Sequence, residues 1–463
     1  MGSDNLRHDP APDTSTSQQP EGAAHLPIVI EADGTIFPVD ILHEQLIAGL
    51  LHQQRTLCSA LGRGGYDSWR DRIARTVQLD AKALPIAAPL VDWLTDRHKA
   101  GTPLFVLSDA AGMIALEGPL RGIASPLPAD EMLAARFPGG FQLLAHPARS
   151  AHAGSISASP PLSVTETYLL PAPGWRQWLQ AIRPHHWAKN VMIFVPFLLD
   201  RGWSSGESLT RILVGFAISL LVVSATYLFN DLCDVSADRR HWSKHQRPIA
   251  SGAIPVLHAA LASMIGIVGG VALGWLLSAA FAGFLLVYVT LTLLYSLWLK
   301  TVPLLDAVVI AVLFTNRLTM GIALTGGRYS EWLLTFAMFF FFDLALAKRH
   351  AELLRSQELG NALARRGYVP EDAALTLVIG VGSGIAALVI MIIFLVLDAF
   401  QRDTFLHPTA LWAVPLLLAI WLGRVWLLAH RGKMPDDPIT FALRDRPSLL
   451  LGALVAAAFV MAL

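Results

Sequence analysis

Three aspartates follow one another at regular spacing at the end of a long apolar stretch. Residues 230–238 read Asn-Asp-Leu-Cys-Asp-Val-Ser-Ala-Asp, directly after an apolar segment of membrane length. If that segment stays helical, Asp231, Asp234 and Asp238 fall at i, i+3 and i+7 and share one face. Carboxylates beside hydrocarbon are costly, so they require a cation, a partner or a chemical role. Two or three hard oxygen donors suit Mg²⁺, which keeps waters and shares its shell with substrate phosphates.

A basic run follows the aspartates and would supply cations for phosphate oxygens. It contains Arg239, Arg240, Lys244 and Arg247. The alternative is a solvated loop between two helices that carries a few charges. The regular spacing of the acids beside a membrane segment favours a metal and phosphate site.

Other polar side chains interrupt the apolar segments and are candidates for the same site. Lys300 and Asp306 flank a short turn that could bring both to the aspartates, or they are a snorkelling lysine and a helix cap. Arg317 lies inside an apolar segment and should face a polar cavity. Asp343 is also a charged residue inside an apolar segment. Either it pairs with Arg317 or with a neighbouring helix, or it has a functional role. Lys348, Arg349, Arg366 and Tyr368 follow in a connection that is either solvated and basic or part of the site.

The composition indicates a membrane protein, because 54% of the 463 residues are hydrophobic and only 15% are charged. The first 175 or so residues are polar and mixed, and nearly everything after residue 187 is apolar. Windows of about 20 residues predict nine spans. They lie at roughly 187–203, 209–230, 257–276, 278–299, 304–324, 331–347, 375–398, 409–429 and 448–463.

Lysine and arginine are distributed unequally between the predicted connections. Connections 1–2, 3–4, 5–6 and 7–8 hold only Arg201, Arg211, Arg328 and Arg402, and the other side holds most of the rest. The positive-inside rule therefore places the amino-terminal domain and every charged motif in the cytoplasm, as in a bacterial plasma membrane protein. The net charge is zero, and no nucleic-acid partner is expected.

The amino-terminal part reads as a small α/β domain. Residues 27–35 are a short apolar strand that runs into an acidic turn, and residues 102–108 read as a second buried strand ending in Ser108. Strand, helices and strand predict a parallel sheet with functional groups at the strand ends. We expect a disordered tail over residues 1–24, this domain over 25–144, a linker over 145–178 and the membrane domain over 179–463. Cys58 and Cys233 lie far apart and imply no disulfide framework.

From about residue 180 onward the chain resembles the UbiA superfamily of intramembrane prenyl-transfer enzymes. The resemblance rests on Asn230-Asp231-x-x-Asp234-x-x-x-Asp238, on Arg247 through Gly252 and on Tyr295 through Asp306. It implies a mostly α fold with nine helices around a cavity that opens to the cytoplasm. It also implies Mg²⁺ held by two aspartate-rich motifs, and transfer of a prenyl group from its diphosphate to an aromatic or lipid acceptor.

Other stretches are similar to one branch, the decaprenyl-phosphate phosphoribosyltransferases. They are Arg183 through Asn190, Tyr295 through Lys300, Arg317 through Gly321, Ala347 through Leu353 and Arg366 through Tyr368. This resemblance implies that a polyprenyl phosphate is the acceptor and phosphoribosyl diphosphate the soluble donor, in a pathway to cell-envelope glycans. The donor's additional phosphate would need more cations, for which Lys244, Arg247, Lys300, Lys348, Arg349 and Arg366 are candidates. Lys189, at the start of the first span, is assigned to the acceptor phosphate, and Asn190, Asn230, Tyr295, Arg317 and Tyr368 complete the substrate-binding set.

The amino-terminal domain resembles a haloacid-dehalogenase-like phosphatase core whose first motif is Asp-x-Asp-Gly-Thr. Asp33 and Ser108 match that family, but Glu31 replaces the nucleophile, and its extra methylene would displace the attacking oxygen. No lysine occurs between residues 100 and 188 to serve as the third motif, and Asp130-Glu131 does not follow a clear strand. We therefore predict a degenerate, inactive phosphatase-like domain; the alternative is that it removes the 5-phosphate from the lipid product.

Three functions from different classes stay open. The first is Mg²⁺-dependent phosphoribosyl transfer to a polyprenyl phosphate, and the second is prenyl transfer to an aromatic or lipid acceptor. The third is a transporter or an inactive membrane scaffold, against which the lack of visible inverted repeats argues.

Overall fold

The computed structural model divides the chain into two compact units, each considered by itself. The units are Met1–Gly49 with Gln53–Pro171, and Leu50–His52 with Ala172–Leu463. The described residues are 26–61, 69, 72–74, 76–128, 133–145, 162–163, 174–200, 205–241, 243–359, 367–401, 405–434, 441–442 and 444–463.

The first unit is built on a five-stranded parallel sheet, as the sequence predicted for its first two strands. The strand order is β3-β2-β1-β4-β5. The strands are β1 (Ile28–Ile30), β2 (Leu104–Leu107), β3 (Ser125–Leu127), β4 (Gln142–Ala145) and β5 (Leu162–Ser163). Every pairing is parallel, and Ile30 lies opposite Val106. Parallel neighbours end at the same edge, so the residues after β1 and β2 meet there.

Both faces of this sheet are covered, which explains its continuous apolar strands. Successive side chains of a strand point to opposite faces. Ile28 and Ile30 accordingly pack in one buried cluster with Leu90 and Leu94, while Val29 packs in another with Leu143. The helices of the unit are α1 (Ile41–His52), α2 (Gln54–Ala60), α4 (Ala88–Lys99), α5 (Ala110–Glu117) and α6 (Leu133–Arg136).

Two details of this unit differ from the sequence prediction. Strand β3 ends three residues before Asp130, so the acidic pair does follow a strand, although the pair itself lies outside the described residues. The strand is only three residues long and contains Pro126, so its sequence has no alternating apolar pattern from which it could be predicted. Strand β5 pairs with β4 inside residues 145–178, so the sheet extends into the range predicted as a linker.

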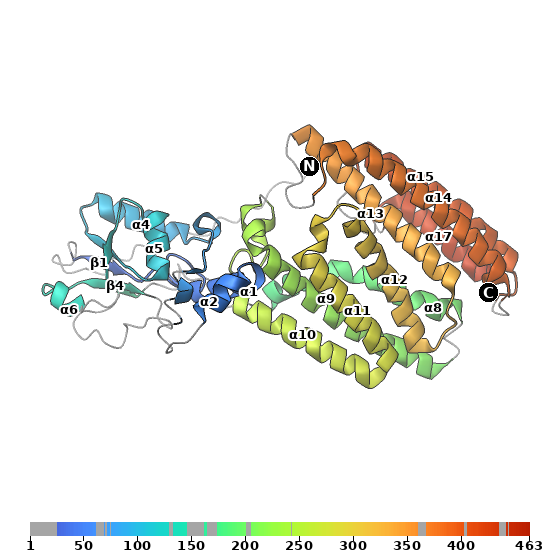
Figure 1. Ribbon diagram of the computed structural model, residues 1–463, viewed down its shortest axis with the longest axis horizontal. Helices are drawn as coiled ribbons and strands as arrows, with labels where there is room; N and C mark the ends of the chain where they lie inside the picture. The colour runs from blue at the N-terminus through green and yellow to red at the C-terminus, as the bar shows by residue number, and fades with distance from the viewer. Residues whose placement is uncertain are drawn as a thin grey trace, which may run out of the picture. The chain divides into compact units, whose positions relative to one another are not determined.

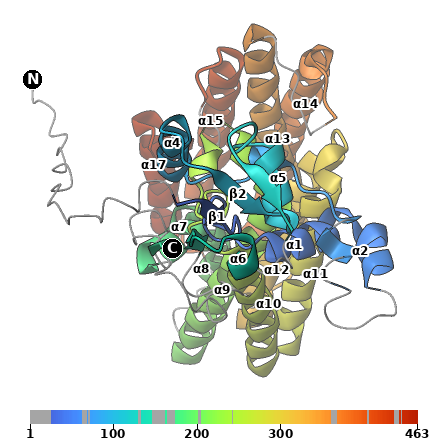
Figure 2. The same ribbon diagram turned by 90° about the vertical axis from the view of Figure 1, so that its left-hand side faces the viewer.

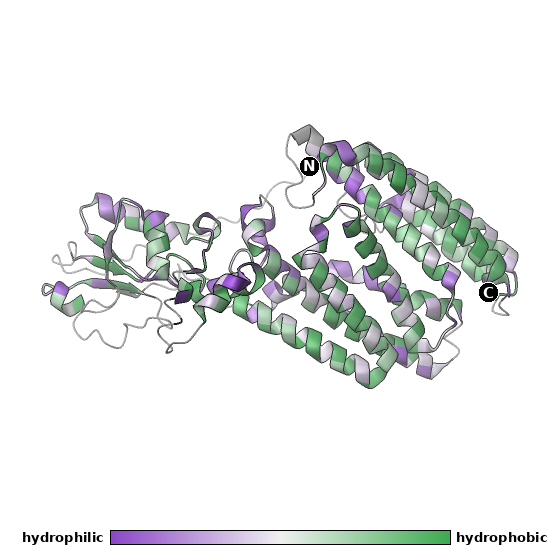
Figure 3. Ribbon diagram, viewed as in Figure 1, coloured by the Kyte–Doolittle hydropathy of each residue, from purple (hydrophilic) through white to green (hydrophobic). Residues whose placement is uncertain are grey.

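The second unit is a bundle of long helices (Figure 1). Its elements are α7 (Trp175–Ala181), the 3₁₀ helix η4 (Pro184–Ile193), α8 (Phe194–Leu199), α9 (Gly206–Arg240), α10 (Val256–Leu277), α11 (Ala279–Leu297), α12 (Leu305–Thr325), α13 (Glu331–Leu359), α14 (Ala373–Leu397), α15 (Ala413–His430) and α17 (Arg446–Ala462). Hydrophobic residues run along most of the length of these helices (Figure 3). The chain is therefore a multi-pass membrane protein.

Among the described residues, six helical segments are long and apolar enough to cross a membrane, so the predicted count of nine is not confirmed. They contain α9, α10, α11, α12, α14 and α15, and α17 is a shorter apolar helix. Within the described residues of the first predicted span, 187–203, the chain is not a single α-helix, because η4 ends at Ile193 and the six-residue α8 follows. Pro196 lacks the amide hydrogen that a continuous α-helix requires, and Lys189 and Asn190 interrupt the apolar surface.

Helices α9 and α10 approach closely because small residues line their interface. A Cβ atom at Gly270 would lie 2.4 Å from Val222 Cγ2, and one at Gly266 would lie 2.7 Å from the Cβ of Ala225. Backbone approach through small residues is the usual way in which membrane helices associate. Figure 2 shows α9, α10, α11 and α12 side by side, and each contacts the next in the chain. This packing fixes the face of α9 that carries the aspartates.

Candidate active site

Helix α9 runs without interruption from the membrane segment through the acidic segment. It begins after the Ser205 cap and ends at Arg240, so the three aspartates occupy its last three turns. Asp231 and Asp238 are buried, at 3% and 4% exposure. The helix therefore carries these carboxylates inside the protein, where they need partners.

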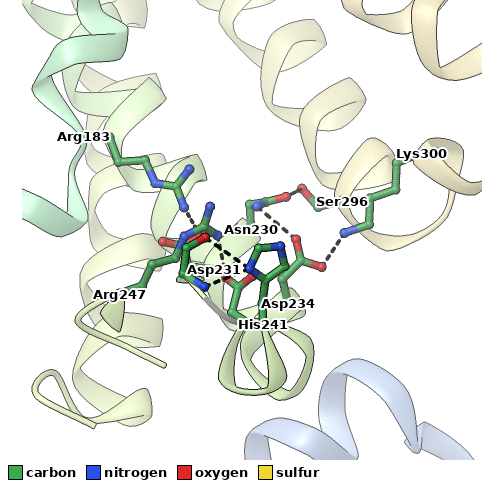
Figure 4. Close-up of polar contacts among 10 residues, drawn as sticks. Arg183, Asn230, Asp231, Asp234, His241, Arg247, Ser296 and Lys300 are labelled. Carbon is green, nitrogen blue, oxygen red and sulfur yellow. Dashed lines mark hydrogen bonds and ion pairs between the residues drawn. The ribbon is translucent and has the colours of Figure 1, made fainter. Parts of the chain in front are cut away.

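Asp231 accepts hydrogen bonds from two arginines that come from different elements (Figure 4). Arg183, at the start of η4, donates to its Oδ1 through Nη2. Arg247 donates to the same oxygen through Nη1 at 3.3 Å and also lies 2.5 Å from Asp238 Oδ2. Arg183 has a left-handed backbone with φ 53°, a strained conformation for a residue other than glycine. Two guanidinium groups thus meet at one carboxylate.

Asp234, on the same helix, has contacts of its own. Lys300 donates to its Oδ1 at 2.7 Å, and Asn230 donates to its Oδ2 at 3.3 Å. Ser296 of α11 in turn donates to Asn230 Oδ1 at 3.1 Å. Each of the three aspartates therefore contacts at least one cationic side chain. Lys300 lies beside the aspartates, as considered from the sequence.

A cavity of about 530 Å³ opens beside Arg183 and Arg247. Its lining is mostly polar or basic: Leu179, Gln180, Arg183, Pro184, His185, His186, Ser243, Gln246, Arg247 and Pro248. Lys244, on the short 3₁₀ helix after α9, is exposed. A cavity with cationic side chains on one wall suits an anion such as a phosphate or diphosphate.

Asp306 belongs to a separate network between the start of α12 and the end of α13. It is fully buried and accepts from Arg349 Nε at 2.6 Å and from the Tyr368 hydroxyl at 2.7 Å. Arg349 also donates to Glu352. The Tyr368 oxygen accepts from the amide of Leu304, whose φ is 63°. Burial raises the pKa of the Tyr368 hydroxyl, and the bond to Asp306 raises it further, so this group stays a neutral donor.

The remaining predicted residues lie in varied surroundings. Arg317 is buried in α12 and donates to Asn190 Oδ1 at 2.8 Å. Lys348 lies 3.8 Å from Glu352, while Lys189 and Tyr295 are partly buried. Asp343 is fully buried and accepts from Trp426 Nε1 of α15 at 2.7 Å, so its partner is a neighbouring helix and not Arg317. Arg366 lies outside the described residues.

Arg183 was missing from the sequence-predicted site, although its segment had been singled out. Its distance of 48 positions from Asp231 hides the contact, and only the fold of η4 against α9 brings them together. The one sequence signal was its place before a proline at the start of a membrane segment. Ser296 was missed for the same reason, because it reaches Asn230 across 66 positions. Glu352 lies only three positions after Arg349, so helical spacing was a sequence signal that could have found it.

The aspartates offer a metal only part of its ligand shell. Among the residues that the structure describes, no group of three His, Cys, Asp or Glu side chains is arranged to hold a metal ion. Carboxylates such as Asp231 and Asp234 are hard oxygen donors, placed one helical turn apart. This donor set fits Mg²⁺ that takes its other ligands from water and substrate phosphate, and it does not fit a metal caged by protein alone.

The edge of the sheet in the first unit holds the other predicted acids. Glu31 directly follows β1 and is 8% exposed, and its Oε2 has no hydrogen-bond partner among the described residues. Asp33 Oδ1 accepts from the amide of Ile41 at 3.1 Å. Ser108 follows β2, where its amide donates to Leu127 at 2.7 Å. The three residues thus follow neighbouring strands at one edge.

Comparison with known proteins places the membrane unit in a family. Residues 191–444 match the model of the UbiA prenyltransferase family. The uncharacterized protein y4nM of Sinorhizobium fredii is 36% identical over 95% of this chain and 91% of its own length. Nodulation protein NoeC of Azorhizobium caulinodans is 31% identical over 61% of this chain and 93% of its own. The decaprenyl-phosphate phosphoribosyltransferase of Mycobacterium tuberculosis is 30% identical over 59% of this chain and 89% of its own.

Among solved structures, a UbiA homolog from Archaeoglobus fulgidus bound to DMAPP and Mg²⁺ matches with a TM-score of 0.47 and 14% identity. The match covers 62% of this chain and 97% of that one. The family model spans more than half of the sequence, and y4nM aligns over nearly all of it. The chain belongs to the UbiA prenyltransferase family.

Proposed function

We propose that the protein transfers the 5-phosphoribosyl group from phosphoribosyl diphosphate to a polyprenyl phosphate, with Mg²⁺, at the cytoplasmic face of the membrane. The observation that carries the proposal is the excess of cations around the aspartates. Arg183, Arg247 and Lys300 contact them, and Lys244 lies exposed nearby in sequence. Phosphoribosyl diphosphate has one phosphate more than a prenyl diphosphate and needs this additional positive charge. The similarity to decaprenyl-phosphate phosphoribosyltransferases supports the same donor and acceptor.

The proposed reaction is a substitution at the anomeric carbon of the donor. An oxygen of the lipid phosphate forms a bond to that carbon, and the bond from the carbon to the diphosphate oxygen breaks. The diphosphate leaves with the electron pair, and no proton need be removed because the attacking phosphate is already an anion. Mg²⁺ on Asp231 and Asp234, with Asp238 as a further ligand, would neutralise the charge that develops on the leaving group.

The protein's own side chains bind and orient the substrates in this scheme. Arg247 and Arg183 would exchange their aspartate contacts for phosphate oxygens, to which a guanidinium binds through two parallel hydrogen bonds. Lys300 would hold Asp234 in place and supply charge to the same phosphates. Asp306, Arg349 and Tyr368 are positioning residues, because their side chains bond to one another and join α12 to α13.

Transfer of label from phosphoribosyl diphosphate to a polyprenyl phosphate tests this function in detergent-purified full-length protein with Mg²⁺. We expect transfer by the wild type and none by Asp231→Asn. Glu207→Gln is the matched control, since Glu207 is an exposed carboxylate at the other end of α9. No transfer, together with turnover of a prenyl diphosphate on an aromatic acid, would instead support prenyl transfer.

We further propose that the first unit is a degenerate haloacid-dehalogenase-like domain on the cytoplasmic side. The parallel sheet with Glu31, Asp33 and Ser108 after neighbouring strands supports this assignment. Glu31 occupies the position of the nucleophile with a longer side chain. Phosphate release from the lipid product, compared between the wild type and Glu31→Asp, tests it. Strong release by the wild type would contradict inactivity.

A further inference from the structure

Arg317 is a buried cation without a carboxylate partner among the residues that the structure describes. Its side chain is 5% exposed in the middle of α12. Nε donates to Asn190 Oδ1 at 2.8 Å and Nη1 to the carbonyl of Leu313 at 2.6 Å. The rings of Tyr288 and Phe314 lie about 5 Å from the guanidinium. All these partners are neutral, and burying a charge against neutral groups alone is costly.

Arg349 is a buried arginine of the same bundle whose charge is neutralised by carboxylates. It is 1% exposed and lies against two carboxylates, Asp306 and Glu352. Both arginines are buried, yet among the described residues only Arg349 has carboxylates that neutralise its charge. Arg317 therefore calls for an anion from outside the chain.

Asn190 offers an unused donor at the same place. It is 1% exposed, and its Nδ2 has no hydrogen-bond partner in the part of the chain that the structure describes. The amide cannot be turned over to satisfy this group, because its nitrogen would then face the Arg317 N–H, donor against donor. An unsatisfied amide donor beside an uncompensated guanidinium forms a receptor for an acceptor-rich anion such as a phosphate.

The packing of η4 on α12 makes this receptor rigid. A Cβ atom at Gly321 would lie 2.1 Å from the carbonyl oxygen of Ile193, so glycine is required for the two backbones to approach. Gly321 follows Arg317 by one helical turn, and Ile193 follows Asn190 by three positions. The contact therefore fixes the two donor-bearing residues relative to each other before any ligand binds.

The position of Arg317 along α12 indicates which phosphate it would bind. Its guanidinium reaches back to Leu313, toward the end of the helix that carries Asp306. On the other side lies an apolar cavity of about 300 Å³. Its lining includes Met192, two positions after Asn190, and Leu318, directly after Arg317, and all its side chains are apolar. Part of the lining comes from the first turns of α13 and the last turns of α14, far along these helices from the acidic end.

We propose that Arg317 and Asn190 bind the phosphate of the lipid acceptor, with its first isoprenoid units in this apolar cavity. The order along the bundle is then the acidic cluster, the phosphate and the apolar tail, as an amphiphile approaching a soluble donor requires. This inference rests on the proposed function for the identity of the lipid. It replaces Lys189, the residue that the sequence assigned to the acceptor phosphate, with a buried pair of donors.

Binding measurements separate this proposal from the transfer reaction. We would titrate farnesyl phosphate, farnesol and phosphoribosyl diphosphate into the full-length protein in detergent by isothermal titration calorimetry. Arg317→Gln should weaken farnesyl phosphate about 10- to 100-fold, the loss expected for charge-assisted hydrogen bonds, and leave the other two ligands unchanged. Asn316→Ala is the matched control, because this neighbouring buried amide already donates to Phe284 at 2.9 Å. It should bind all three ligands as the wild type does.

Asn190→Asp tests the same site while keeping the arginine. The new carboxylate would lie against Arg317 and neutralise it from within, so thermal stability should be retained or raised. Farnesyl phosphate binding should fall about tenfold or more, because the anion would meet a repelling charge and lose a donor. This variant decides the question if Arg317→Gln fails to fold.

The outcomes are distinct. Unchanged farnesyl phosphate binding in both variants would overturn the proposal and leave Arg317 a structural residue. Selective loss of phosphoribosyl diphosphate binding would also overturn it, since the anion would then be the donor's 5-phosphate. If the wild type binds farnesyl phosphate as expected but transfers nothing, the proposed function fails while the phosphate site stands.

Discussion

The acidic cluster of α9 and the acidic turn after β1 both carry closely spaced acidic residues, but the partners of their carboxylates differ. On α9, Asp231 meets Arg183 and Arg247, and Asp234 meets Lys300. After β1, Glu31 is buried as well, but its Oε2 has no partner among the described residues. Buried carboxylates with several cations can exchange them for a metal and phosphate. A buried carboxylate oxygen without such a partner costs stability. We therefore expect the proposed chemistry at α9 rather than at the sheet edge.

The largest difference between the two regions should appear in transfer activity. Asp231→Asn or Asp234→Asn should lower kcat/KM at least about 10²- to 10³-fold, because the ligands for leaving-group neutralisation are lost. Glu31→Gln should leave the rate unchanged. Label transfer from phosphoribosyl diphosphate, with folding checked by thermal unfolding, measures both. Full activity in both aspartate variants would refute the metal role of α9.

A smaller effect should follow from changing the shape of a cation without its charge. Arg183→Lys should lower kcat/KM about tenfold, because lysine lacks the planar fork that binds a carboxylate or phosphate through two bonds. It also loses the contact with the Tyr227 ring, 5.5 Å from the guanidinium. Arg176→Lys, an exposed change on α7, is the control. Equal rates for the two variants would show that charge alone matters at this position.

At the sheet edge the expected effect concerns stability. Glu31→Gln removes the charge of a buried carboxylate whose Oε2 has no partner among the described residues, and should stabilise the first unit by about 1 kcal/mol. Slower hydrogen exchange of the β1 amides in the full-length protein would show it. Faster exchange would mean that the Glu31 charge has a stabilising role, and the contrast between the two regions would be lost.

The smallest effect is expected from the network that supports α12. The pKa of Tyr368 is raised in the folded protein, so its stabilising contribution is complete below about pH 10, where an ordinary tyrosine ionises, and is lost as the pH rises further. Tyr368→Phe should cost about 1 kcal/mol of stability at pH 7 and leave the pH profile of transfer unchanged below pH 9. A new step in that profile would make Tyr368 a proton-transfer group.

Much of this arrangement could be read from residue types and periodicity. The sequence placed Asp231, Asp234 and Asp238 on one face on the condition that the segment stays helical, and α9 does continue to Arg240. The apolar windows located the long helices α9, α10, α11, α12 and α14. The strands after residues 27 and 103 and their parallel pairing were also predicted. The first span was wrong as a single helix, because hydropathy does not register that Pro196 cannot donate the backbone hydrogen bond of a continuous α-helix. Strand β3 failed because three residues are too few for a periodic pattern.

The sequence by itself determined which chemistry was available: carboxylates at helical spacing, cations beside them and apolar length enough to cross a membrane. Only the tertiary structure decided which groups meet. It brought Arg183 to Asp231 and Asp306 to Arg349 and Tyr368. It placed Arg317 against Asn190, with no carboxylate partner among the described residues. The physical reason is that local spacing fixes neighbours within one helix. Contacts across 48 or 127 positions depend on how whole helices pack, which small residues such as Gly321 control.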